Sequence, residues 1–151
     1  MDKSKTAVII GHSECREISE AAVKTAVEQL INSGVTLFLS GGMGGFDRLC
    51  AGAIHRIKKI HPEICSDIVI PYLSFRIFER NYFDHIIYPE GFEKYYFKAV
   101  IPARNAYMVR NSGFALCYIN HGWGGAAQTY RQAVKKNLHI INLGTLPVSN
   151  A

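Results

Sequence analysis

Two glycine-rich segments carry the residues best suited to hold an anion. The first reads SGGMGGFD over residues 40–47, and the second reads NHGWGG over residues 120–125. Glycine loses more conformational freedom on folding than any other residue, so such clusters indicate a tight turn or a close approach to a ligand. Neither segment has the Gly-Lys-Ser/Thr ending of a P-loop or the G-x-G-x-x-G dinucleotide fingerprint, so neither of these two sites is predicted.

The hydrophobic pattern places both segments directly after buried strands. Continuous apolar runs typical of strands covered on both faces lie at 6–10, 35–39, 67–70, 85–88, 114–119 and 139–143. Helical spacing of apolar residues lies between them, at 18–33, 46–57, 102–111 and 125–136, with a short helix at 75–81. We expect Pro102 to open its helix, because proline lacks the N–H that a first helical residue does not use.

Strands that alternate with helices predict one α/β domain over residues 1–151, with a mainly parallel sheet and helices on both faces. Ligands of such sheets bind at the carboxyl ends of the strands, where helix N-termini offer free N–H groups to anions. We therefore expect the two glycine turns to form two walls of one crevice. The expected ligand-binding residues are Gly11, His12, Ser40, Gly41, Gly42, Met43, Gly44, Gly45, Asp47, Arg104, Asn105, His121, Gly122, Trp123, Gly124 and Gly125.

Several polar and aromatic side chains allow two interpretations. Arg104 could grip a phosphate through two parallel hydrogen bonds, or it could pair with an acid on the surface. Asp47 could cap a helix or accept hydrogen bonds from ribose hydroxyls. Asn105 could support a neighbouring turn or contact the ligand, and Trp123 could stack on a base or cover the core.

Metal chemistry is not expected. His12 and His121 both follow strands, but no carboxylate or cysteine accompanies either histidine at ligand spacing. The four cysteines lie far apart, which argues against a disulfide framework and favours a reducing, cytoplasmic setting. We therefore expect no metal and no cofactor.

The charge is mildly basic, with 17 Lys and Arg against 12 Asp and Glu, a net charge of +5 and a pI near 9.1. The positive residues are scattered, so solvated surfaces explain them better than a nucleic-acid interface does, although nucleic acid stays possible. No signal peptide and no apolar run of 18 residues is present, so no membrane partner is expected. The aromatic-rich stretch 72–97 could fill the core, cover the crevice or form a homo-oligomer surface, and we expect a homo-oligomer.

Four motifs in this order resemble the SLOG superfamily, which joins DNA-processing protein A with the Lonely Guy (LOG) phosphoribohydrolases. They are GHSE at 11–14, SGGMGGFDRLCA at 40–51, ARNAYMVRNS at 103–112 and GWGGAAQT at 122–129. The resemblance implies a Rossmann-like fold and a nucleotide or nucleotide-derived ligand. It also implies that the glycines of both turns approach phosphate or sugar, and that Arg104 lies at the site.

One departure bears on catalysis. LOG enzymes carry P-G-G-x-G-T-x-x-E, whose glutamate helps to cleave the N-glycosidic bond, whereas this chain has Gln128 nearby and no matching proline, threonine or glutamate. An amide is not basic enough to accept a proton in that reaction. The sequence therefore favours a ligand-binding or sensing module. An N-glycosidic hydrolase that uses Asp47 or Glu14 with Arg104, and a single-stranded nucleic acid binder, are the alternatives.

Overall fold

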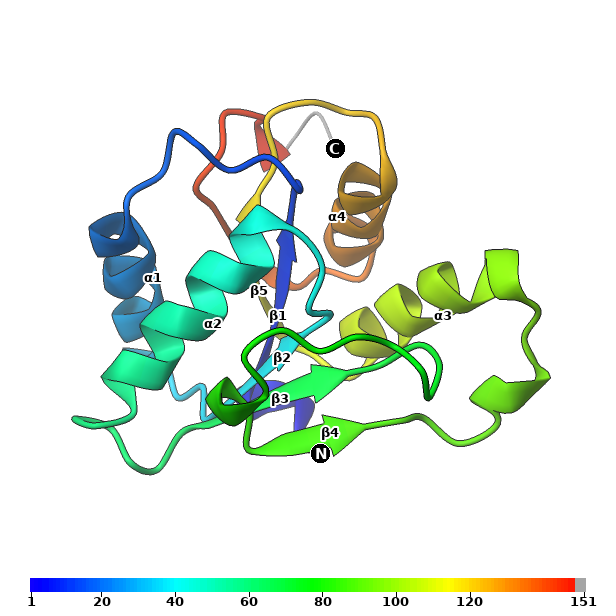
Figure 1. Cartoon of the computed structure of the whole chain (residues 1–151). Helices are drawn as coiled ribbons and strands as arrows, with labels where there is room; N and C mark the ends of the chain where they lie inside the picture. The colour runs from blue at the N-terminus through cyan, green and yellow to red at the C-terminus, as the bar shows by residue number, and fades with distance from the viewer. Residues whose placement is uncertain (149–151) are drawn as a thin grey trace.

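The computed structural model describes residues 1–148 and contains a six-stranded sheet in the order β4-β3-β2-β1-β5-β6, with every described pairing parallel (Figure 1). Its elements are η1 (Lys3–Lys5), β1 (Thr6–Gly11), α1 (Glu20–Asn32), β2 (Leu37–Ser40), α2 (Gly45–Ile57), β3 (Cys65–Val69), η2 (Arg80–Tyr82), β4 (His85–Ile87), η3 (Phe92–Lys94), α3 (Phe97–Arg110), β5 (Phe114–Tyr118), α4 (Gly125–Lys135) and β6 (His139–Asn142).

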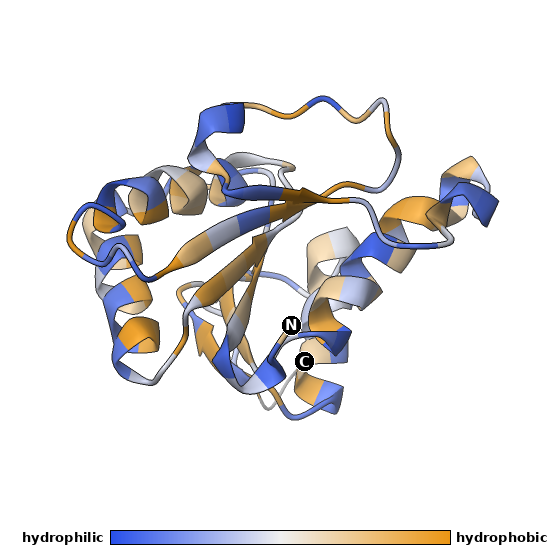
Figure 2. Ribbon diagram, turned by 90° about the horizontal axis from the view of Figure 1, so that it is seen from below, coloured by the Kyte–Doolittle hydropathy of each residue, from blue (hydrophilic) through white to orange (hydrophobic). Residues whose placement is uncertain are grey.

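The helices cover both faces of the sheet, which confirms the expected α/β architecture. Successive side chains of a strand point to opposite faces. Accordingly, Ala7 and Ile9 of β1 pack in the core beneath α1 and α2, whereas Val8 and Ile10 pack beneath α3 and α4. Hydropathy follows the same layers, because the central strands are mainly hydrophobic while the helices carry both hydrophobic and hydrophilic residues (Figure 2).

Helix boundaries follow local signals. The Ser19 hydroxyl accepts a hydrogen bond from the Ala22 N–H and so caps α1. Gly34, with φ of +102°, ends that helix. The N–H of Val35, which follows it, donates to the carbonyl of Leu30 in the last turn of α1. This arrangement is typical of a glycine C-terminal cap.

Two sequence expectations are wrong. Pro102 does not open a helix, because α3 begins five residues earlier, at Phe97. The additional turn buries Val100, and this packing outweighs the single hydrogen bond that proline cannot donate. The helix expected at 75–81 is absent, and only the 3-10 turn η2 forms there, preceded by Glu79 in the left-handed conformation.

The strand order of the sheet reverses between β1 and β5. From β1 the chain continues through β2, β3 and β4 on one side, whereas β5 and β6 lie on the other. Loops from β1 and β5 therefore diverge at their carboxyl ends, and this is where open α/β sheets bind ligands.

Gly11, the last residue of β1, supplies a test of the packing at this edge. A Cβ at Gly11 would overlap with the ring of Phe46, which is fully buried. We expect Gly11→Ala to lower the unfolding free energy by about 1–3 kcal/mol through overpacking. Gly125→Ala is the matched control, because nothing lies within 4 Å of its Cβ position, and its melting temperature should be unchanged or slightly raised. Equal melting temperatures for both variants would contradict this description.

Candidate functional site

A cavity of about 390 Å³ lies at the carboxyl ends of the central strands, between the two glycine turns and α3. Of the expected residues it brings together Gly11, His12, Gly41, Met43, Asp47, Arg104, Asn105, His121, Trp123, Gly124 and Gly125, and Glu14 also lines it. Ser40, Gly42, Gly44, Gly45 and Gly122 do not line the cavity. The two turns thus contribute unequally to its wall.

The first glycine turn is closed by the protein itself. The N–H of Met43 donates to Asp47 Oδ2 at 2.8 Å, and the N–H of Gly45 donates to the Ser13 carbonyl, also at 2.8 Å. The N–H of Gly42 donates to the hydroxyl of Ser40. The N–H groups of Met43 and Gly45 are therefore already used, and Gly44, Gly45 and Phe46 at the start of α2 do not line the cavity.

The glycines of this turn are required by contacts within the chain. Gly44 has φ of +90°, and a Cβ on it would lie 2.8 Å from the Cα of Ser13. A Cβ on Gly41 would lie 2.9 Å from Cζ of Arg104. Both distances are too short for real atoms, so these glycines make room for a loop and for a guanidinium group.

The second glycine turn is open. Nothing lies within 4 Å of a Cβ placed on Gly122, Gly124 or Gly125. No side chain caps α4, its first turn contains no acidic residue, and the N–H groups of Gly124, Gly125 and Ala126 donate to no acceptor within residues 1–148. A helix N-terminus in this condition has free donors and a partial positive charge.

Arg104 joins α3 to the ends of two strands and is only 2% exposed. Its Nη1 donates to the carbonyls of Gly41 and Val69, each at 2.8 Å, and its Nε donates to Asn105 Oδ1 at 2.9 Å. Burial lowers the pKa of Arg104 to about 10, which leaves the group charged at neutral pH. Arg104 is thus neither a surface residue nor a free phosphate fork, since most of its donors bind the protein.

Asp47 lies three residues into α2 and is 7% exposed. Burial raises its pKa to about 7, while the hydrogen bond from Met43 and the charge of Arg104 oppose that rise. Only Oδ2 has a partner within residues 1–148, so Oδ1 remains available on the cavity side. Asp47 does not cap α2 in the ordinary way, because the N-cap position belongs to Gly44.

Three aromatic rings form a stack at the cavity wall. His12 stacks on His121 with ring centroids 3.8 Å apart, and His121 stacks on Trp123 at 3.6 Å. The N–H of Asn120 donates to Nε2 of His12, and this bond fixes the orientation of the His12 ring. Burial lowers the pKa of His12. Trp123 is 70% exposed, so one face of its indole is available to a flat ligand while His121 covers the other.

Sequence reasoning missed other parts of the wall. Ile101 and Met108 share a face of α3 with Arg104 and Asn105, and all four line the cavity. Their spacing of three and four residues is the signal that would have identified them. Thr129 of α4 also lines the cavity and is buried, whereas Gln128 beside it is exposed and does not line it.

Within residues 1–148, no group of three or more His, Cys, Asp or Glu side chains is arranged to hold a metal ion. No helix in that same range is both long and apolar enough to cross a membrane.

No protein-family model and no curated protein matches the sequence. Structures of two DNA processing proteins are among the solved structures similar to it. One is DNA processing protein A from Helicobacter pylori, described for its single-stranded DNA binding mode, with 17% identity and a TM-score of 0.63 over 98% of this chain and 78% of that one. The other is DNA processing protein A from Streptococcus pneumoniae, with 16% identity and a TM-score of 0.65 over 93% of this chain.

This chain spans half the length of the Streptococcus pneumoniae protein. At 16% and 17% identity, the similarity establishes the fold alone. It extends over nearly the whole chain, and it confirms the fold that the resemblance of the sequence motifs implies. The chain therefore has the Rossmann-like fold of DNA processing protein A.

Proposed function

We propose that the protein binds a nucleotide or nucleotide-derived small molecule and holds its phosphate at the N-terminus of α4. The observation that carries this proposal is the difference between the two glycine turns. One is closed by Asp47 and Ser13, whereas the other presents free N–H groups to the same cavity. Helix N-termini of this kind are established sites for phosphate.

The cavity supports a small ligand. Its volume of about 390 Å³ is near the lower end of the range for small-molecule sites. Gly124, Gly125 and Ala126 at the start of α4 line the cavity, whereas Gly44, Gly45 and Phe46 at the start of α2 do not. This difference favours one phosphate subsite over the two that a dinucleotide pyrophosphate would use. The exposed face of Trp123 offers an aromatic surface suited to a base.

The phosphate subsite can be tested by introducing a negative charge at the start of α4 without disrupting the helix. We expect Gly125→Glu to remove measurable binding of 5′-AMP, 5′-GMP, 5′-CMP and 5′-UMP in calorimetry, because its carboxylate would occupy the place of the phosphate. An acid in the first turn of a helix is favourable for stability, so the melting temperature should not fall. Gly125→Gln controls for size, and it should retain more binding than the glutamate variant. Equal affinity of wild type and Gly125→Glu for all four nucleotides would refute the subsite.

The same proposal predicts binding without turnover. General acid–base catalysis is typically worth about 10²–10⁴ in rate, and exposed Gln128 supplies neither an acid nor a base to the cavity. We expect no free base from the four nucleoside monophosphates during hours at micromolar protein, as measured by chromatography. Many turnovers per hour, lost in Asp47→Asn, would instead favour an N-glycosidic hydrolase.

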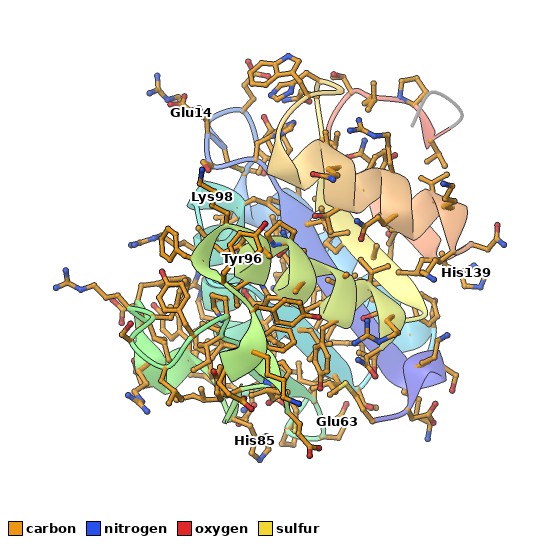
Figure 3. All side chains as sticks on the ribbon, turned by 90° about the vertical axis from the view of Figure 1, so that its right-hand side faces the viewer. Glu14, Glu63, His85, Tyr96, Lys98 and His139 are labelled. Carbon is orange, nitrogen blue, oxygen red and sulfur yellow. The ribbon has the colours of Figure 1, made fainter. Side chains whose placement is uncertain are left out.

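A second candidate function is the binding of single-stranded nucleic acid. Residues 94–98 read Lys-Tyr-Tyr-Phe-Lys, and Tyr95, Tyr96 and Phe97 are 49%, 73% and 78% exposed. Neither flanking lysine forms an ion pair within residues 1–148, and Tyr96 and Lys98 lie on the face turned to the viewer in Figure 3. Exposed aromatic rings between cations are typical of stacking platforms for bases.

This second candidate predicts that an oligonucleotide binds with steep salt dependence and that Phe97→Ala weakens it by about 1–3 kcal/mol, the value of one stacked base. Fluorescence anisotropy of a labelled oligothymidine measures both effects. Salt-independent binding, or an unchanged affinity of the alanine variant, would exclude this surface.

The homo-oligomer expected from the sequence stays a prediction, which native mass spectrometry of the purified protein would check.

A further inference from the structure

The cavity wall between α2 and α3 presents one hydrogen-bond acceptor and one donor that the protein leaves without partners. We infer that Asp47 and Asn105 together bind the adjacent hydroxyls of a ribose, so that the site selects ribonucleotides over deoxyribonucleotides. This inference rests on the proposed function, and it names the class of nucleotide that the site would accept.

Asp47 supplies the acceptor in its ionised form, which prevails above its pKa of about 7. The side chain is more than nine-tenths buried, and Oδ2 is held by the N–H of Met43 at 2.8 Å. Oδ1 has no partner within residues 1–148, and the residue lines the cavity. Because the Asp47 side chain is largely buried, a ligand group that donates to Oδ1 gains more than it would at a fully exposed carboxylate.

Asn105 supplies the donor, and its orientation is fixed. Because Nε of Arg104 donates to Oδ1 of Asn105 at 2.9 Å, the Nδ2 amide group must point the other way. That amide has no acceptor within residues 1–148, and Asn105 also lines the cavity. Its two N–H groups are therefore free for a ligand oxygen.

The charges and the free hydrogen-bonding atoms of this pair favour hydroxyls over a cationic amine. The charge of Arg104 acts on Asp47 and offsets part of the attraction that the carboxylate would exert on an amine. A base edge that donates two parallel hydrogen bonds matches two free acceptors, whereas here one oxygen of Asp47 already accepts from Met43 and Asn105 offers a donor. Two neighbouring hydroxyls match this combination, because one can donate to Asp47 while the other accepts from Asn105.

A site that selects ribose would distinguish this chain from its structural neighbours in ligand chemistry. DNA lacks the 2′-hydroxyl, which is the group that lets a protein distinguish RNA from DNA. A site built to bind a hydroxyl rejects the analogue that lacks it, because its own polar groups are then left unpaired. The central cavity would thus reject deoxyribose even though the fold is that of a protein described for single-stranded DNA binding.

The test compares each nucleoside 5′-monophosphate with its 2′-deoxy counterpart by calorimetry, and ribose 5-phosphate with 2-deoxyribose 5-phosphate to remove the base. Fluorescence of Trp123, the single tryptophan of the chain, provides a second readout from the cavity wall. At a pH above the Asp47 pKa of about 7, we expect the 2′-deoxy compounds to bind about tenfold more weakly or worse, as for the loss of a hydrogen bond to a charged group. Similar affinities within each pair would overturn the inference.

Two nearly isosteric variants test the residues separately. Asp47→Asn can still accept from Met43 but turns the free acceptor into a donor. Asn105→Asp can still accept from Arg104 but turns the free donor into an acceptor. Each variant should bring the ratio of ribo to deoxy affinity close to one, and thermal unfolding checks that each is folded. If Asp47→Asn does not fold, Asn105→Asp decides the question alone.

The outcomes separate this inference from the proposed function. One outcome is that binding needs the phosphate and is lost in Gly125→Glu but shows no preference for ribose. This result would support the phosphate subsite and reject only the role of Asp47 and Asn105. A ribose preference that persists in a folded Asn105→Asp variant likewise rejects their role. Absence of binding for every compound rejects both proposals.

Discussion

The buried guanidinium of Arg104 is the constraint on which the arrangement of the site depends. A charge that is 98% removed from solvent needs acceptors of fixed position, and the carbonyls of Gly41 and Val69 supply two of them at 2.8 Å. These bonds hold α3 against the carboxyl ends of β2 and β3. They also explain why residue 41 is glycine, because a Cβ there would lie 2.9 Å from Cζ of the arginine.

The same constraint decides which turn can hold an anion. Arg104 and Met43 both favour an ionised or hydrogen-bonded carboxyl beside them, and Asp47 supplies it from the first turn of α2. The start of α2 therefore has its own acid, whereas the first turn of α4 has none. A phosphate at α2 would compete with a carboxylate that the protein has placed there, while at α4 it would meet only free N–H groups.

Much of the fold was predictable from the sequence. Strands that are buried on both faces are continuous runs of apolar residues, and the local hydrophobic pattern identifies such runs. The site was predictable only in part. Gly44 and Gly124 have nearly the same backbone conformation, with φ of +90° and +95°, and both stand at helix N-caps. Their difference comes from Ser13, a residue distant in sequence that packs on Gly44 and has no counterpart at Gly124. Pro102 failed as a boundary signal for a similar reason, since tertiary packing of Val100 extends α3 beyond it.

The central claim is that one glycine turn is closed and the other receives the phosphate, and a ¹⁵N-resolved NMR titration with a nucleoside monophosphate tests it most directly. The account predicts that the amide signals of Gly124, Gly125 and Ala126 shift strongly and saturably, while those of Met43 and Gly45 change little because their hydrogen bonds to Asp47 and Ser13 persist. The corresponding nucleoside without phosphate should leave all five signals nearly unchanged. Large shifts at Met43 and Gly45 with none at the start of α4 would contradict the account.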